Sequence, residues 1–176
     1  MRAATLLVAL LSFPAFAQPP DGGVGPDAMP TDAECLPLPA LAAPYAFGPG
    51  EVLEFDVDAM GARAAQMTMR VLPVKDARLP IEIHVETNTF FNKVRRVNGT
   101  GMSYLNPKTL RPLRYYEDTI ENDTHRVADV SFDPRTHQVA LTSTIDGQTG
   151  KMLFRYDDDG LDVSGTIFLL RQLPFK

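Results

Sequence analysis

The stretch from Val94 to Tyr116 places the strongest constraint on how this chain folds. Large side chains recur at every second position on both sides of the tetrapeptide Asn106-Pro107-Lys108-Thr109, and these are Met102, Tyr104, Leu113 and Tyr115. Such alternation is typical of a strand with one buried face. Proline fixes the backbone at the second position of a type I turn, and the Asn106 side chain can bond back to the main chain. The stretch therefore predicts a β-hairpin.

Similar alternation continues on both sides of this hairpin. Short turn sequences separate the further segments, which are 53–59, 65–71, 81–85, 128–132, 139–145 and 152–156. Asp146-Gly147, between the last two, is a strong signal for a two-residue hairpin turn. About eight strands at intervals of roughly 8–12 residues predict an antiparallel meander. Because a flat sheet would expose an apolar face and two edges, we expect an all-β, curled meander that forms an open or partly closed barrel.

The segment from Asp162 to Gln172 departs from this alternation. Asp162 is a suitable helix cap, and apolar residues follow at near-helical spacing before Pro174, namely Ile167, Phe168, Leu170 and Leu173. We expect one short C-terminal helix that covers the apolar face of the sheet.

The N-terminal part of the chain has a different composition. Arg2, an apolar run and the sequence Ala15-Phe16-Ala17 form the pattern of a secretory signal peptide cleaved after Ala17. The next 32 residues hold eight of the fifteen prolines, which predicts a Pro-rich linker or disordered lead. We therefore expect a signal peptide in residues 1–17, a linker in 18–49 and a single antiparallel β domain in 50–176. The protein would be periplasmic or secreted.

Charge, hydropathy and cysteine content narrow the range of partners. The net charge is -5 and no basic patch occurs, which argues against nucleic acid and against electrostatic docking on anionic lipid. The apolar run of the signal sequence is too short for a transmembrane span, and no second run is long enough. Cys35 is the only cysteine. Two interpretations of it stay open: an unpaired thiol in a flexible segment, or a thiol whose partner lies beyond Lys176 or on another chain.

A succession of short motifs resembles a known family. The motifs are Pro49-Gly50-Glu51, Met60-Gly61, Asn88 to Phe91, Asn106 to Leu113, Phe132-Asp133-Pro134, Asp162-Val163-Ser164 and Phe168 to Pro174. In this order they resemble bacterial exported proteins of the domain of unknown function 3108 family, from about Pro49 to Lys176. That family has no agreed activity, so the resemblance implies no reaction. Its members usually continue for several more strands, so the resemblance leaves two alternatives open: a sheet that is complete at Lys176, or one that is C-terminally incomplete there.

Residue types that carry metal or catalytic chemistry are scattered. His84, His125 and His137 fall on different predicted strands and lack the spacing of zinc ligands. The acidic run from Asp157 to Asp162 partly matches a calcium loop, but no glutamate closes it, and a solvated turn is the simpler interpretation. The sequence contains no nucleophile elbow, phosphate loop or dinucleotide-binding motif. We therefore predict that the protein is not an enzyme and needs neither a metal nor a cofactor.

Methionines on the predicted strands suggest a binding function. Our leading hypothesis is a non-enzymatic envelope protein that binds a lipid or other apolar ligand in its curled sheet, because methionine side chains adapt to such ligands. The predicted lining residues are Met67, Met69, Met102, Met152 and Phe168. The competing interpretation is that these side chains form an ordinary core. The alternative function is a structural or assembly factor of the envelope that presents its edge strands to a protein partner.

Overall fold

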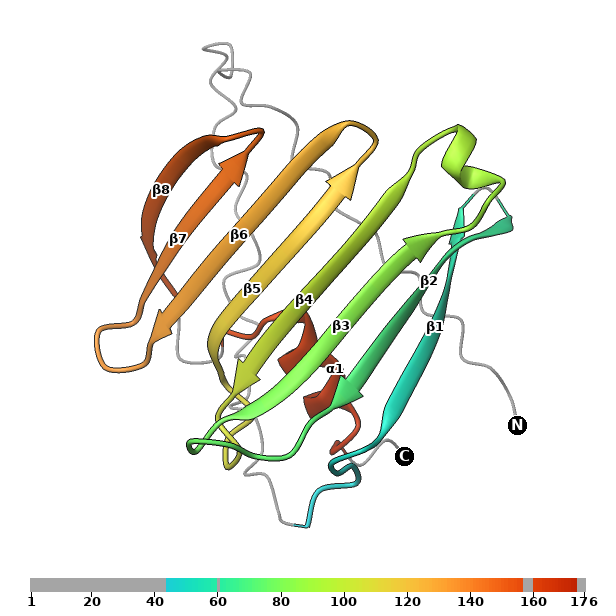
Figure 1. Ribbon diagram of the computed structural model, residues 1–176. Helices are drawn as coiled ribbons and strands as arrows, with labels where there is room; N and C mark the ends of the chain where they lie inside the picture. The colour runs from blue at the N-terminus through green and yellow to red at the C-terminus, as the bar shows by residue number, and fades with distance from the viewer. Residues whose placement is uncertain (1–43, 60, 157–159, 174–176) are drawn as a thin grey trace, which may run out of the picture.

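The structure, a computed structural model, describes residues 44–59, 61–156 and 160–173. These residues form one eight-stranded sheet and a single α-helix (Figure 1). The strands are β1 (Val52–Ala59), β2 (Ala62–Val71), β3 (Leu79–Thr87), β4 (Val97–Leu105), β5 (Pro112–Glu121), β6 (Thr124–Asp133), β7 (Gln138–Ile145) and β8 (Gln148–Arg155). A 3-10 helix, η1 (Phe91–Lys93), lies between β3 and β4, and the helix α1 (Val163–Leu170) follows β8. The predicted signal peptide, Cys35 and residues 157–159 lie outside the described residues.

The all-β meander with one short C-terminal helix is confirmed. Each strand pairs antiparallel with the next, so β1 and β8 are the two edges. The sheet is neither closed nor strongly curled (Figure 1), and the partly closed barrel that we expect from the sequence is not formed. The reason is that α1 lies against β2, β3 and β4 and buries their apolar side chains, so this part of the face is covered without closure.

Local turn chemistry explains the hairpins. The Asn106 side-chain oxygen accepts a hydrogen bond from the Lys108 N–H at 2.9 Å, and the Asn106 carbonyl accepts one from the Leu110 N–H at 2.8 Å. Asp146 and Gly147 have φ values of 48° and 82°, the left-handed conformation that a two-residue hairpin turn requires. Both turns form where the sequence predicts them.

Side chains alternate between two faces of the sheet, which we call the helix face, against which α1 lies, and the outer face. The strand register aligns side chains across neighbouring strands. One row on the helix face consists of Leu53, Met69, Ile83 and Gly101, and the adjacent row on the outer face consists of Glu54, Thr68, His84 and Thr100. The helix face is therefore apolar here, and the outer face is polar.

The core lies between α1 and the first four strands. Its fully or almost fully buried members are Met69, Val71, Leu79, Ile81, Leu105, Leu110 and Phe168. The ring of Phe47 packs on that of Phe168 with a centroid distance of 4.6 Å. At the end of the helix, Arg171 forms an ion pair with Glu51 at 2.6 Å. These contacts hold the helix to the start of the sheet.

The sequence predicts that Leu170 is on the buried side of α1, but Leu169 takes this place in the structure. Phe168 is fully buried as predicted, but Leu169 is 5% exposed and Leu170 is 42% exposed. Ser164, Gly165, Phe168 and Leu169 form the buried stripe, because residues four apart lie on one side of a helix. Within the described residues no helix is long and apolar enough to cross a membrane.

Candidate ligand-binding face

The helix face continues beyond the area that α1 covers. On β6, β7 and β8 two rows of apolar side chains lie next to each other. The first row is Val130, Leu141 and Met152, and the second is Phe132, Val139 and Phe154. We call these six residues the open patch.

Exposure separates the open patch from the core. Met69 on β2 is fully buried, whereas Met152 and Phe154 on β8 are 49% and 47% exposed. Among the inner members of the patch, Val130, Phe132 and Leu141 are half-buried and Val139 is buried. The apolar face of the sheet therefore extends past its cover, and its exposure is greatest on the edge strand β8.

The structure brings together three of the five predicted lining residues. Met69 and Phe168 are in the core, and Met67 packs against it from the same strand as Met69. Met152 belongs to the open patch, at the opposite edge of the sheet. Met102 lies on the outer face, where it is aligned with Glu82 and Tyr116. These five side chains therefore do not surround one common site.

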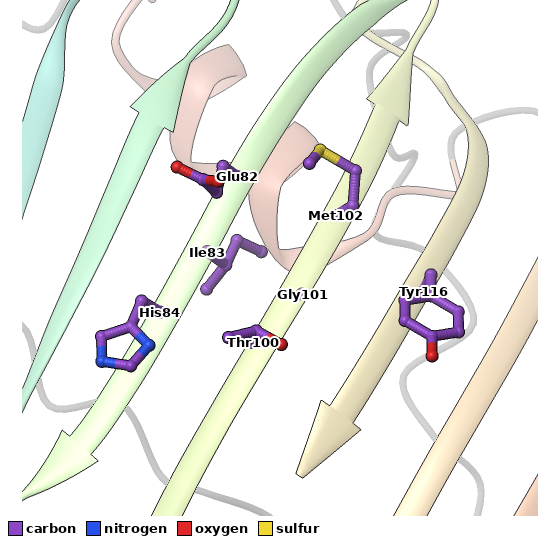
Figure 2. Close-up of a pocket in the computed structure, with 7 residues that line it drawn as sticks. All are labelled: Glu82, Ile83, His84, Thr100, Gly101, Met102 and Tyr116. Atoms are coloured by element: carbon purple, nitrogen blue, oxygen red, sulfur yellow. The ribbon is translucent and has the colours of Figure 1, made fainter.

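Two hollows lie elsewhere on the described part of the chain. The first, of about 540 Å³, is on the outer face and is lined by Glu82, Ile83, His84, Thr100, Gly101, Met102 and Tyr116 (Figure 2). The second, of about 420 Å³, is at the polar ends of β2 and β3 and includes Asn88 and Asn92. Between α1 and the sheet, Met69 and Phe168 fill the space. Neither of these two hollows is lined by residues of the open patch.

A cluster of polar side chains lies at the boundary between the core and the open patch. Asp162 caps α1 by accepting a hydrogen bond from the Gly165 N–H at 2.6 Å, and it accepts a second from the buried hydroxyl of Ser103. Burial raises the pKa of the Asp162 carboxyl group. The Tyr115 hydroxyl donates to Glu117 at 2.9 Å, and burial, followed by the charge of Glu117, raises the pKa of Tyr115.

This cluster has a structural role that its contacts explain. The Ser103 hydroxyl links β4 to the cap of α1 across 59 positions of sequence. The Ser164 hydroxyl is buried and has no hydrogen-bond partner among the described residues. The Ser103 hydroxyl donates to a carboxylate, Asp162, whereas a serine nucleophile is typically activated by an imidazole. The cluster positions the helix.

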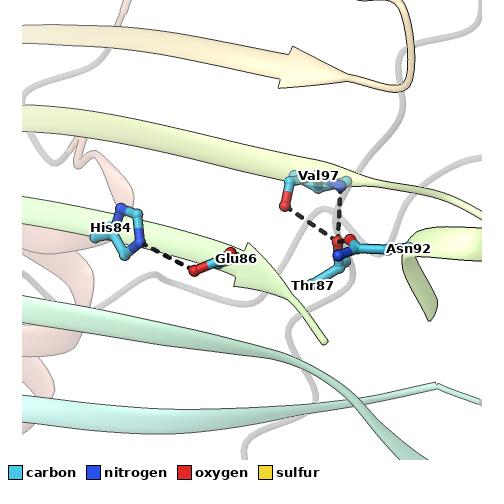
Figure 3. Close-up of polar contacts among 5 residues, drawn as sticks. All are labelled: His84, Glu86, Thr87, Asn92 and Val97. Carbon is cyan, nitrogen blue, oxygen red and sulfur yellow. Dashed lines mark hydrogen bonds and ion pairs between the residues drawn. The ribbon is translucent and has the colours of Figure 1, made fainter. Parts of the chain in front are cut away.

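Two of the three histidines, His84 and His125, lie beside different carboxylates. His125 lies 2.7 Å from Asp118, and His84 lies 3.9 Å from Glu86 (Figure 3). Within the described ranges, no three side chains of the types that bind metals converge on one point. Residues 157–159, part of the acidic run considered for calcium, are outside those ranges.

The motif that begins at Asn88 shapes the connection from β3 to β4. The Asn88 side chain accepts hydrogen bonds from the N–H groups of Phe90 and Phe91 at 3.0 and 2.9 Å. Thr87 accepts one from the Val97 N–H at 2.8 Å and contacts Asn92 (Figure 3). Phe91 is buried and Phe90 is exposed. The motif is therefore explained by its local structure.

Comparison with known proteins places the chain in a family. The family model described as protein of unknown function DUF3108 matches residues 54–174, which is most of the chain and includes α1 and all of the sheet except the first two residues of β1. The chain belongs to this family. The comparisons with curated proteins and with solved structures gave no match.

In this DUF3108 domain the open patch includes residues that the sequence analysis does not single out. Val130, Leu141 and Phe154 fall within predicted strands but are not among the predicted lining residues. For Phe154 the sequence does contain a signal. Met152, Leu153 and Phe154 are three consecutive apolar residues, so the last strand has no purely polar face. A strand of this kind is typically covered on both sides, yet β8 is exposed along its whole length.

Proposed function

We propose that this DUF3108 domain is a non-enzymatic binding domain of the bacterial cell envelope, and that it holds an apolar ligand such as a lipid acyl chain on the open patch. One observation carries the proposal: the apolar helix face continues beyond α1 over β6, β7 and β8, and Met152 and Phe154 at its margin are about half exposed. Location in the envelope rests on the signal-peptide pattern of residues 1–17.

The size and nature of the patch support an apolar ligand. Contiguous apolar surface on a soluble domain typically marks an interaction site, whereas single exposed apolar residues do not. Full burial of a Met or Phe side chain contributes about 1.5–3 kcal/mol, so covering the margin of the patch gives a useful binding energy. Methionine adds flexibility, which lets one surface accept chains of different shape.

Polar residues limit the patch on one side. The next row along the helix face consists of Glu117, Ala128, Ser143 and Gly150. A chain lying on the two apolar rows would therefore meet carboxylate and hydroxyl groups at its end. This arrangement favours an amphipathic ligand, with its apolar part on the patch and its polar end near Ser143.

Displacement of a hydrophobic fluorescent probe by a fatty acid or a phospholipid tests the proposal. Phe154→Ser should weaken both probe and lipid binding, because it removes apolar area from the margin of the patch. Leu153→Ser is the matched control, since Leu153 is on the same strand and 65% exposed but lies on the outer face. Equal binding by the parent and Phe154→Ser, or equal loss in both variants, would contradict an apolar ligand on the patch.

A specific observation also favours the second function, a structural or assembly factor that acts through protein partners. Strand β8 is exposed on both faces, and within the described residues no strand pairs with the edge of β8 that points away from β7. An edge of this kind can add a strand from another protein. Native mass spectrometry of the protein as isolated separates the two functions, because a retained lipid supports the first and a retained protein the second.

A further inference from the structure

The two edges of the sheet carry opposite charges on the outer face. Strand β1 presents Glu54, Asp56 and Asp58, and β8 presents Lys151 and Arg155. Asp56 pairs with Arg63 on β2. For Glu54 and Asp58, and for the two basic residues of β8, the described part of the chain provides no ion-pair partner.

The same residues direct their backbone groups away from the sheet. The Tyr156 N–H donates to the His137 carbonyl at 3.0 Å, so β8 residues at even positions bond to β7. Because backbone direction alternates along a strand, Lys151, Leu153 and Arg155 point their N–H and C=O groups outward. On β1, the Glu51 carbonyl accepts from the Val71 N–H at 2.9 Å, which by the same alternation leaves the even positions 54, 56 and 58 pointing outward.

Strand direction allows the two edges to meet. In a meander of eight strands the first and the last run in opposite directions. A second copy that is placed beside β8 in the same orientation therefore brings its β1 antiparallel to β8. The helix faces of both copies then lie on the same side of a continuous sheet.

We propose that β8 of one copy pairs with β1 of a second copy, head to tail and antiparallel. With Arg155 opposite Glu54, the register places Lys151 opposite Asp58. The helix-face pairs that follow from this register are Phe154 with Phe55 and Met152 with Val57. Two pairs of opposite charge meet on the outer face, with Leu153 opposite Asp56 between them, and apolar side chains meet on the helix face. The Asp56 carboxylate keeps its ion pair with Arg63.

The charge pattern selects this pairing over pairing of like edges. A β1–β1 contact brings six carboxylates together, and a β8–β8 contact brings four cations together, and like charges across strands are destabilising. Charged edges also serve in many proteins to prevent any pairing. To prevent pairing, charges of the same sign on both edges would be enough. Prevention of pairing therefore does not explain why the two edges carry opposite signs. Head-to-tail pairing generates a chain of copies or a closed ring.

This inference does not rest on the apolar-ligand function. Pairing uses the edge strands and covers Met152 and Phe154 on the helix face, whereas Val130 and Leu141 lie on the inner strands β6 and β7 and stay accessible. Sedimentation velocity of the whole chain over a concentration series, at low and high salt, tests it. We expect the parent to self-associate, and we expect the association to weaken at high salt. A parent that stays monomeric throughout overturns the proposal, and so does a parent that binds only a different protein.

Charge reversal makes the test specific. Lys151→Glu with Arg155→Glu, and separately Glu54→Lys with Asp58→Lys, should each weaken self-association on the order of tenfold or more, because each variant presents two edges of like charge. An equimolar mixture should associate again, since every β8 then meets a β1 of opposite charge. Association of either variant alone at the parental level, or no recovery in the mixture, overturns the proposal. Melting curves check that both variants are folded, and unchanged probe binding keeps this result separate from the function proposed above.

Cysteine cross-linking tests the register. In a Cys35→Ser background, Lys151→Cys combined with Asp58→Cys should give disulfide-linked oligomers, because opposite residues of an antiparallel ladder have Cα atoms about 5.5 Å apart or less. The control combines Lys151→Cys with Thr100→Cys, which is on the outer face of the central strand β4 and should give no ladder of oligomers. Linkage through Lys151→Cys alone would indicate β8–β8 contact and would overturn the assignment.

Discussion

Strands β2 and β8 carry the same kind of side chain on the same face of one sheet, but these side chains differ in burial. Met69 on β2 is fully buried under α1, whereas Met152 on β8 is about half exposed. Both strands alternate, and both alternations place methionine on the helix face. The comparison shows that alternation determines which face a side chain is on. A second layer of structure determines whether that face becomes a core or stays a surface.

The boundary between the two regions is set by the length and position of α1. The helix has eight residues, so it spans about 12 Å at 1.5 Å per residue. Neighbouring strands are about 4.8 Å apart, so a helix of this length cannot cover the width of eight strands. The Ser103–Asp162 hydrogen bond fixes its first turn over β4, and the strands from β6 onward lie beyond its reach.

The largest expected difference between the two regions is in their phenylalanines. Phe168→Ala should lower the free energy of unfolding by about 3–5 kcal/mol, because it removes a fully buried ring and leaves a cavity. Phe154→Ala should cost less than about 1 kcal/mol, since its ring is about half exposed and the site is open to water. Urea unfolding of the two variants measures the difference. Comparable losses would show that the open patch is covered in solution, and Met69→Ala against Met152→Ala repeats the comparison with a second residue type.

Local features of the fold could be predicted from the sequence. The turn at Asn106, the hairpin at Asp146-Gly147 and the cap at Asp162 each depend on residues within a few positions of one another. Turn and cap preferences act over this distance. The number, order and pairing of the strands could also be predicted from the positions of these turns, because consecutive strands joined by short turns have few other ways to pair.

The predicted lining residues do not surround one common site. Whether two side chains share a site depends on strand register and on contacts between distant parts of the sequence, which local patterns do not determine. The register of β4 and β5 shifts between Tyr104 and Leu105, and a bulge of this kind changes which residues share a face. The extra residue is on β5, so Met102 is aligned with Tyr116, and Tyr115 lies on the helix face, opposite to the face of Met102. The boundary of the core depends on the Ser103–Asp162 contact between distant parts of the sequence, which no local pattern indicates.

A smaller difference is expected for two serines on the helix face. Ser103→Ala should lower the free energy of unfolding by about 1–3 kcal/mol, because it leaves the buried Asp162 carboxylate without one of its hydrogen-bond donors. Ser143 is on the same face of β7 and half-buried, and Ser143→Ala should change stability by about 0.5 kcal/mol or less. Urea unfolding again provides the measurement. An equal effect of both substitutions would show that Ser103 does not anchor the helix.

The smallest expected effect is in the pH dependence of stability, where two aspartates should act with opposite sign. Burial raises the pKa of Asp162 above its usual 3.8. Its stabilising contribution is therefore complete below pH 3.8 and is lost as the pH rises through the raised pKa of the folded state. The hydrogen bond with Arg114 lowers the pKa of Asp129 below 3.8. Its contribution is present above pH 3.8 and is lost as the pH falls through the lowered pKa.

Urea unfolding between about pH 2.5 and 7 of the parent, Asp162→Asn and Asp129→Asn tests this contrast. Asparagine retains the capping ability of Asp162, so the comparison isolates its charge. The stability of the parent relative to Asp162→Asn should decrease as the pH rises. Relative to Asp129→Asn it should increase with pH, by a modest amount because the Arg114–Asp129 pair is partly exposed to solvent. Parallel pH profiles for the two variants would mean that Asp162 is hydrated in solution, and the helix would then not seal the boundary of the core.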